Sequence, residues 1–240
     1  MKMIFHPSSS RGYVNHGWLE ANHSFSFAHF FDTNKINFGA LRVLNDDKIA
    51  PGMGFGTHPH DNMEIITVPL SGVLKHKDSM TEQWLTVEAG EVQVMSAGTG
   101  VYHSEMNASS TEDLKLFQIW ILTNREGVSP RYDQKHFELV PAGELQILVE
   151  SIDDFKLETS LKVYQNAQIS RINLNAGDQF LYQLKSNTHG VYVMQVFGSS
   201  RIENQQLNKR DALGVSNLNQ FEIVAHQDSQ LLFIEVPMKF

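Results

Sequence analysis

The chain has 240 residues, with 19 lysines and arginines against 27 aspartates and glutamates, for a formal net charge of −8. The basic residues are scattered along the sequence, which disfavours direct nucleic-acid binding because that needs a basic footprint. There is no cysteine, which excludes disulfides, thiolate nucleophiles, cysteine-ligated zinc and iron–sulfur clusters.

From about residue 38 onward, short apolar and β-branched runs alternate with Gly, Asn, Asp and Ser, which is typical of an antiparallel barrel or sandwich. Gly72 and Gly90 stand where tight turns are expected, because glycine supplies the positive φ that hairpin turns need. The strands predicted in the first half are 38–44, 63–69, 73–77, 83–87, 91–95, 101–107 and 115–122.

A polar stretch, 123–133, leads into a second set of predicted strands that echoes the first. In this set a turn is expected at Gly198-Ser199 and another at Gly214, before a closing pair of strands. A repeated order of strands indicates two copies of one unit, so we expect two domains, 1–137 and 138–240. The second set of predicted strands is 146–150, 162–164, 168–174, 179–184, 191–197, 221–225 and 231–236.

The apolar runs are of strand length, and the N-terminal segment has no apolar stretch long enough for a signal peptide. We therefore expect a cytoplasmic protein that is neither exported nor inserted into a membrane.

Two glycine-rich segments carry the residues that suggest a metal site. His58 and His60 share one face of a strand, because alternate side chains of a strand point the same way, and His103 and Glu105 do the same about forty residues later. Two such pairs on neighbouring strands can converge on one ion. The sequence therefore predicts one metal site made of these four residues.

The alternative is that these histidines are surface residues or satisfied core residues. The other histidines lack a partner at strand spacing in a glycine-rich setting, and we expect each of them to be structural: His6, His16, His23, His29, His76, His136, His189 and His226.

The two segments resemble the two cupin motifs, and the wider pattern is similar to that of the pirin family, particularly its bacterial branch. The resemblance covers residues 6 to about 137. It is carried by Gly52, His58-Pro-His60 and Glu64, by Gly100, His103 and Asn107, and by Arg11-Gly12, His16-Gly-Trp-Leu19, Ser24-Phe-Ser-Phe-Ala28, the run from Leu41 to His60 and Met95-Ser-Ala-Gly-Thr-Gly100.

The resemblance implies an all-β bicupin of two antiparallel, jelly-roll-type β-barrels packed face to face, with metal only in the N-terminal barrel. The implied ligands are His58, His60, His103 and Glu105. In many other cupins the residue matching Glu64 is the ligand. We expect Glu64 here to lie behind the ligands and to orient an imidazole.

A set of three histidines and one carboxylate leaves coordination positions open and accepts Fe, Cu, Ni, Co, Mn or Zn. The resemblance favours non-haem iron and implies quercetin 2,3-dioxygenase activity, with a flavonol and dioxygen as substrates and Glu105 as the group that accepts the substrate proton. Phe55, Met95 and Trp120 lie near the ligands in sequence and could wall an aromatic pocket, although core packing is the simpler reading.

Two other functions fit the same residues, because fold does not settle function. One is a regulatory or redox-sensing protein that keeps the metal and acts through a protein partner, as some pirins are thought to do. The other is a metal-dependent enzyme for a different small cyclic or enolic molecule.

Overall fold

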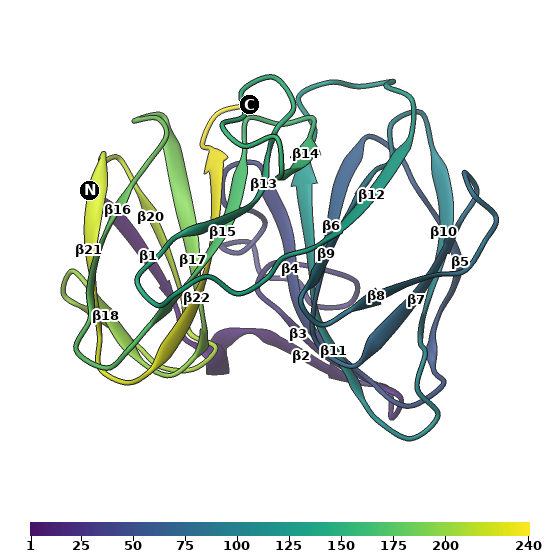
Figure 1. The fold of residues 1–240 in the computed structure, drawn as a ribbon, viewed down its shortest axis with the longest axis horizontal. Helices are drawn as coiled ribbons and strands as arrows, with labels where there is room; N and C mark the ends of the chain where they lie inside the picture. Colours follow the sequence, from purple (N-terminus) through teal and green to yellow (C-terminus); the bar gives the residue numbers. More distant parts are fainter.

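The computed structural model describes residues 1–240, which form four β-sheets: two of seven strands and two of four strands (Figure 1). A 3-10 turn, η1 (Ser8–Ser10), is the one helical element, and no helix is long and apolar enough to span a membrane. All strand pairs are antiparallel except β13 with β14. The all-β class expected from the sequence is confirmed, although each half is built of two separate sheets that do not close into a barrel.

One seven-stranded and one four-stranded sheet make up the N-terminal half (Figure 1). The strand orders are β12-β9-β6-β11-β4-β3-β2 and β5-β10-β7-β8. Their bounds are β2 (Gly12–Asn15), β3 (Leu19–His23), β4 (Leu41–Ile49), β5 (Gly54–His60), β6 (Met63–Ser71), β7 (Val73–Asp78), β8 (Leu85–Glu88), β9 (Glu91–Ser96), β10 (Val101–Asn107), β11 (Leu114–Leu122) and β12 (Arg131–His136).

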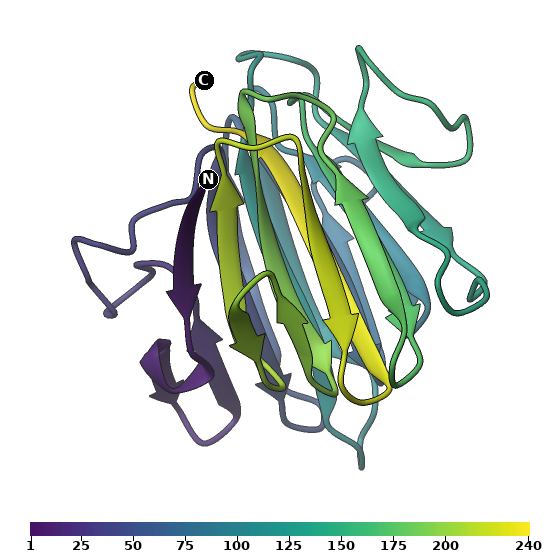
Figure 2. The same ribbon diagram turned by 90° about the vertical axis from the view of Figure 1, so that its left-hand side faces the viewer.

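The C-terminal half has the same division into sheets, with the orders β1-β20-β17-β22-β15-β13-β14 and β16-β21-β18-β19. Figure 2 shows β1, the first strand of the chain, at the edge of this seven-stranded sheet beside β20. The bounds are β1 (Lys2–His6), β13 (Gln146–Ser151), β14 (Leu161–Val163), β15 (Gln168–Leu174), β16 (Gln179–Gln183), β17 (His189–Phe197), β18 (Ser200–Ile202), β19 (Gln205–Leu207), β20 (Ala212–Ser216), β21 (Gln220–Ala225) and β22 (Ser229–Pro237).

The two halves correspond strand by strand. β5 and β10 occupy in the first four-stranded sheet the places that β16 and β21 occupy in the second. The chain passes from one half to the other between β12 and β13. The domain boundary near residue 138 stays a prediction, and β1 is an N-terminal segment that pairs within the C-terminal sheet.

The two seven-stranded sheets pack against each other through the largest apolar cluster of the molecule, which contains 26 buried residues. Ile66, Phe117 and Ile119 contribute from the N-terminal half, and Ile169 and Leu232 from the C-terminal half. Each half also has a cluster between its own sheets, of 14 residues in the C-terminal half. Apolar burial at this scale dominates the free energy of folding, so we expect the fold to persist without a metal ion.

The predicted turns at Gly72, Gly90 and Gly198 are confirmed, since each glycine has a positive φ between two consecutive strands. They are not hairpin turns, because in each case the two strands belong to different sheets and do not pair. The turn predicted at Gly214 is wrong, because this residue lies inside β20. A Cβ atom at Gly214 would come within 2.6 Å of the Phe38 ring, so glycine is needed there for close packing and not for a turn.

The first predicted strand, 38–44, is misplaced: β4 begins at Leu41 and continues to Ile49. Its second part carries Asn45-Asp-Asp-Lys48, a run that resembles a loop. The structure supports this polar run inside a sheet because Asp46 pairs with Arg11 and with Arg210, at 3.3 and 2.8 Å. The polar stretch 123–133 likewise contains the start of β12, which pairs with β9.

Candidate metal centre

The four predicted ligands lie on two neighbouring strands, β5 and β10. Their antiparallel register sets His103 directly opposite His58, and Val101 opposite His60. The register shifts between His103 and Glu105, which is a β-bulge of the kind that re-aims a side chain. The alternation of side chains along both strands therefore brings the two pairs to one face of the sheet.

The three imidazoles form a compact cluster. The ring centroids are 4.3 Å apart for His58 and His103, 4.8 Å for His60 and His103, and 5.0 Å for His58 and His60. One nitrogen from each ring lies within 4.8 Å of the others. This spacing suits three nitrogens that share one ion.

The free nitrogens of these rings support the same interpretation. His60 Nε2 and both ring nitrogens of His103 are buried and have no hydrogen-bond partner. His58 Nδ1 lies 2.8 Å from the Gly56 carbonyl oxygen, which leaves Nε2 free to bind a metal. Buried polar atoms are rarely left unpaired, so these nitrogens fit a metal ion as their partner.

Burial keeps two of the imidazoles in the neutral form that metal binding requires. Together with the neighbouring imidazoles, it lowers the pKa of His103 to about 2 and that of His60 to about 4. These two imidazoles therefore accept a cation at neutral pH without first losing protons.

Glu105 is almost completely buried beside His103. Gln118 Nε2 donates to both carboxylate oxygens, at 3.1 and 3.0 Å, and burial raises the pKa of Glu105 to about 7. Thr67 in turn donates to Gln118 Oε1 at 3.0 Å. Gln118 and Thr67 therefore fix the orientation of Glu105, and the sequence analysis missed both of them.

His76 lies close to the cluster, with its ring centroid 5.3 Å from that of His103. It forms a second potential ligand group with His103 and Glu105. Both of its ring nitrogens are occupied, however: Nε2 lies 3.0 Å from Asp78 Oδ2, and Nδ1 lies 3.2 Å from Gln93 Nε2. These contacts favour a supporting role for His76 behind the ligands.

The interpretation of Glu64 as a residue that orients a ligand imidazole is wrong. Its carboxylate accepts a 2.6 Å hydrogen bond from Ser96 Oγ and belongs to neither ligand group. Along β6, Glu64 alternates with Ile65 and shares its face with Ile66, a residue of the core between the two halves. Glu64 therefore faces the other half of the molecule.

A pocket of about 450 Å³ opens over the imidazole cluster. Its wall includes aromatic residues from two strands and two connecting segments, namely Phe55, Trp120, Trp18 and Phe27. Of the three residues considered from sequence, Phe55 and Trp120 line the pocket, whereas Met95 packs in a small core cluster. The pocket therefore suits a flat aromatic molecule next to the ligand nitrogens.

Asp47 is a buried acid in the wall of this pocket. Its Oδ1 atom has no hydrogen-bond partner, and neither has Trp120 Nε1. Burial raises the pKa of Asp47 to about 8, and the charges of Asp46 and Glu105 add to the effect. At neutral pH, Asp47 is therefore largely protonated and can donate a hydrogen bond into the pocket.

The corresponding strands of the C-terminal half carry apolar side chains. Tyr182 on β16 and Phe221 and Ile223 on β21 point into the 14-residue core, and the rings of Tyr182 and Phe221 stack at 5.3 Å. His189 is paired with Glu235 at 3.0 Å, and His226 is exposed. The interior that holds imidazoles in one half is filled by apolar side chains in the other.

Two double-sheet β-domains packed face to face, with a histidine cluster in one of them, define a bicupin with one candidate metal centre. The pirin family profile matches residues 5–121, and a profile described as the quercetinase C-terminal cupin domain matches residues 148–236. The chain belongs to the pirin family.

Individual relatives agree over nearly the full length. Quercetin 2,3-dioxygenase of Escherichia coli strain K12 is 42% identical over 230 residues, which are 96% of each chain. A pirin-like protein of Caulobacter vibrioides is 37% identical over 95% of this chain and 97% of its own. The crystal structure of the bacterial pirin YhhW from Escherichia coli in complex with nickel(II) superposes with a TM-score of 0.91, at 39% identity, over 98% of this chain and 99% of that chain.

Proposed function

We propose that the protein is a metal-dependent dioxygenase that cleaves flavonols such as quercetin, at one mononuclear centre held by His58, His60, His103 and Glu105. The observation that carries this proposal is the convergence of unpartnered imidazole nitrogens at an aromatic-walled pocket. The 42% identity to the Escherichia coli quercetin 2,3-dioxygenase supports the same activity.

A divalent transition metal ion bound by these residues would supply Lewis acidity toward a substrate oxygen. We propose iron as the resident ion, although the ligand set equally accepts Cu, Ni, Co, Mn or Zn. The nickel(II) complex of the Escherichia coli pirin supports the binding of a divalent metal ion by this protein. Metal analysis of freshly purified protein identifies the ion.

The other side chains of the pocket have two roles. Phe27, Phe55 and Trp120 exclude water and hold a flat ring system over the imidazoles. Glu105 accepts the proton of the flavonol hydroxyl at a carboxylate oxygen, and Gln118 keeps that carboxylate in place through its two hydrogen bonds.

The proposal is tested by giving quercetin to the iron-loaded protein and recording flavonol absorbance, oxygen uptake and carbon monoxide release. We expect all three to change in equal molar amounts and to stop when oxygen is removed. Metal-loaded protein that leaves quercetin intact, and that instead retains a protein partner tightly, would contradict the enzyme and favour a regulatory role. The cytoplasmic location stays a prediction.

A further inference from the structure

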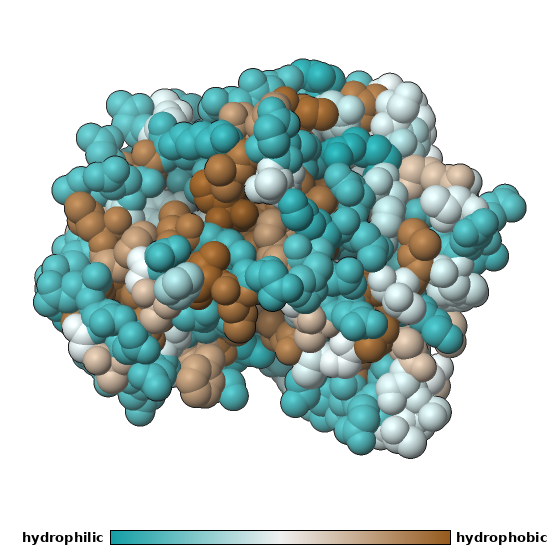
Figure 3. Space-filling view, in the orientation of Figure 1, coloured by the Kyte–Doolittle hydropathy of each residue, from teal (hydrophilic) through white to brown (hydrophobic).

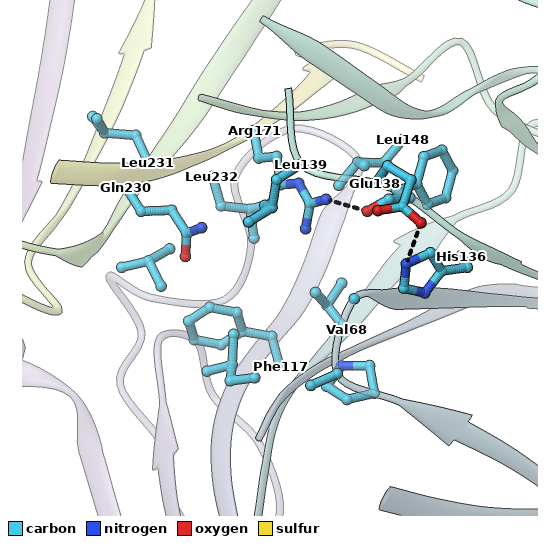
Figure 4. Close-up of a pocket in the computed structure, with 16 residues that line it drawn as sticks. Val68, Phe117, His136, Glu138, Leu139, Leu148, Arg171, Gln230, Leu231 and Leu232 are labelled. Atoms are coloured by element: carbon cyan, nitrogen blue, oxygen red, sulfur yellow. Dashed lines mark hydrogen bonds and ion pairs between the residues drawn. The ribbon is translucent and has the colours of Figure 1, made fainter. Parts of the chain in front are cut away.

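A second cavity, of about 400 Å³, lies between the two halves of the molecule. Figure 4 shows that side chains of both seven-stranded sheets line it, with Val68 and Phe117 on one side and Leu148 and Leu232 on the other. Ten of its 16 lining residues are hydrophobic, and none belongs to the candidate metal centre. In the space-filling view, hydrophobic atoms are exposed where the two halves meet (Figure 3).

Arg171 interrupts this apolar lining. On β15, Ile169 packs in the core between the halves, and Arg171, two residues later, lies on the same face of the strand. The apolar surface between the two sheets therefore ends at the guanidinium group of Arg171, which lines the cavity.

The guanidinium has no acidic partner. Its Nε donates to Gln146 Oε1 at 2.7 Å and its Nη2 donates to the Phe137 carbonyl at 2.8 Å, but no carboxylate lies within 4.0 Å. Glu138, the nearby acid drawn in Figure 4, has a largely exposed side chain and pairs with His136.

A purely structural role accounts for only part of these contacts. By bonding to Phe137, Arg171 ties the connection after β12 to the sheet, but this uses only some of its five N–H donors. Burial also lowers the pKa of Arg171, which reflects the free-energy cost of a partly desolvated cation. A structural tie explains neither the missing counterion nor the apolar space beside it.

We infer that this cavity binds a small apolar carboxylic acid, whose carboxylate pairs with Arg171 and whose hydrocarbon part lies against Phe117, Leu148 and Leu232. A carboxylate on a guanidinium forms short, charge-assisted hydrogen bonds, and the apolar walls supply the hydrophobic part of the affinity. A volume of about 400 Å³ is at the small end of the range for ligand pockets, which favours a ligand of about ten heavy atoms. This inference does not depend on the proposed enzyme activity.

Octanoate is the probe that tests this inference, with octanamide as the uncharged control of the same shape. Calorimetric titration of the protein with its metal retained should show one octanoate per chain and at least tenfold weaker binding of octanamide. Arg171→Gln should weaken octanoate binding at least tenfold, and Arg171→Lys should retain part of it because the charge remains. Arg201→Gln is the matched control, because Arg201 lies on β18 in the four-stranded sheet of the same half, and it should bind octanoate like the parent.

Two further variants keep the test decisive if Arg171→Gln folds poorly. Gln230→Trp adds a large side chain at the edge of the cavity and should block octanoate, whereas His103→Ala disables the candidate metal centre and should not affect it. The inference is overturned if octanoate does not bind, if octanamide binds equally well, or if His103→Ala removes the binding. It is also overturned if Gln230→Trp instead changes the oligomeric state, because a second chain would then cover the cavity.

Discussion

Replacing Asp47 by asparagine should change how the stability of the metal-free protein depends on pH. The pKa of Asp47 is raised from 3.8 to about 8 in the folded chain, mainly by burial. Between these two values the folded protein holds a proton at Asp47 that the unfolded chain has released. The free energy of unfolding must therefore fall as the pH rises through this range.

The magnitude follows from the two pKa values. One proton contributes up to about 1.4 kcal/mol per pH unit, so the whole interval sets an upper limit of roughly 6 kcal/mol. Between pH 6.5 and 8 the parent should lose about 1 to 2 kcal/mol relative to Asp47→Asn, which cannot ionise. Histidine titration largely cancels in this comparison, because the parent and Asp47→Asn carry the same histidines.

Urea unfolding with a metal chelator present, at pH 6.5, 7.2 and 8, measures the difference between parent and variant at each pH. We expect the variant to become the relatively more stable protein as the pH rises. Parallel stability curves would show that Asp47 is ionised throughout the range. A parent that gained stability relative to the variant would show that a cation stabilises the carboxylate.

Three other changes test the centre and the core. His103→Ala should abolish metal retention while the circular dichroism spectrum stays that of the parent, because the apolar clusters stabilise the fold. Loss of the β-sheet spectrum would mean that the metal site is structural. Glu105→Gln, reloaded with excess metal, should keep part of its metal yet lose about a hundredfold or more in quercetin turnover, whereas Glu64→Gln should change turnover little. Near-parent turnover by Glu105→Gln, or loss of metal by Glu64→Gln, would reverse the roles assigned to the two glutamates. Gly214→Val should displace the Phe38 ring and lower the free energy of unfolding, measured by urea titration, by about 1 to 3 kcal/mol. An unchanged urea midpoint of unfolding would mean that the Phe38 ring can move aside freely.

The sequence predicted the parts of this molecule that follow from local pattern. The spacing of His58 and His60, and of His103 and Glu105, requires only the alternation of a strand, and β5 and β10 place the two pairs side by side. The turn glycines were predictable from local pattern too, because a backbone position with a positive φ strongly favours glycine.

The missed features depend on contacts between distant segments. Glu64 was assigned to the centre from its motif, and only the pairing of β6 with β9 shows that its carboxylate meets Ser96. Gln118 did leave a signal, as the one polar residue of the otherwise apolar run 116–122 in β11, where a buried amide must find partners. Its partner, Glu105, could not be identified without the fold.

We propose that this protein cleaves flavonols with one metal ion per chain, held in the N-terminal half. The most direct test is to measure oxygen-dependent quercetin cleavage while the metal-free chain is titrated with ferrous iron. We expect no cleavage without metal and a linear rise that reaches a plateau at one ion per chain. Cleavage by the metal-free chain, a plateau at two ions, or no cleavage at any ratio of metal to protein would contradict this proposal.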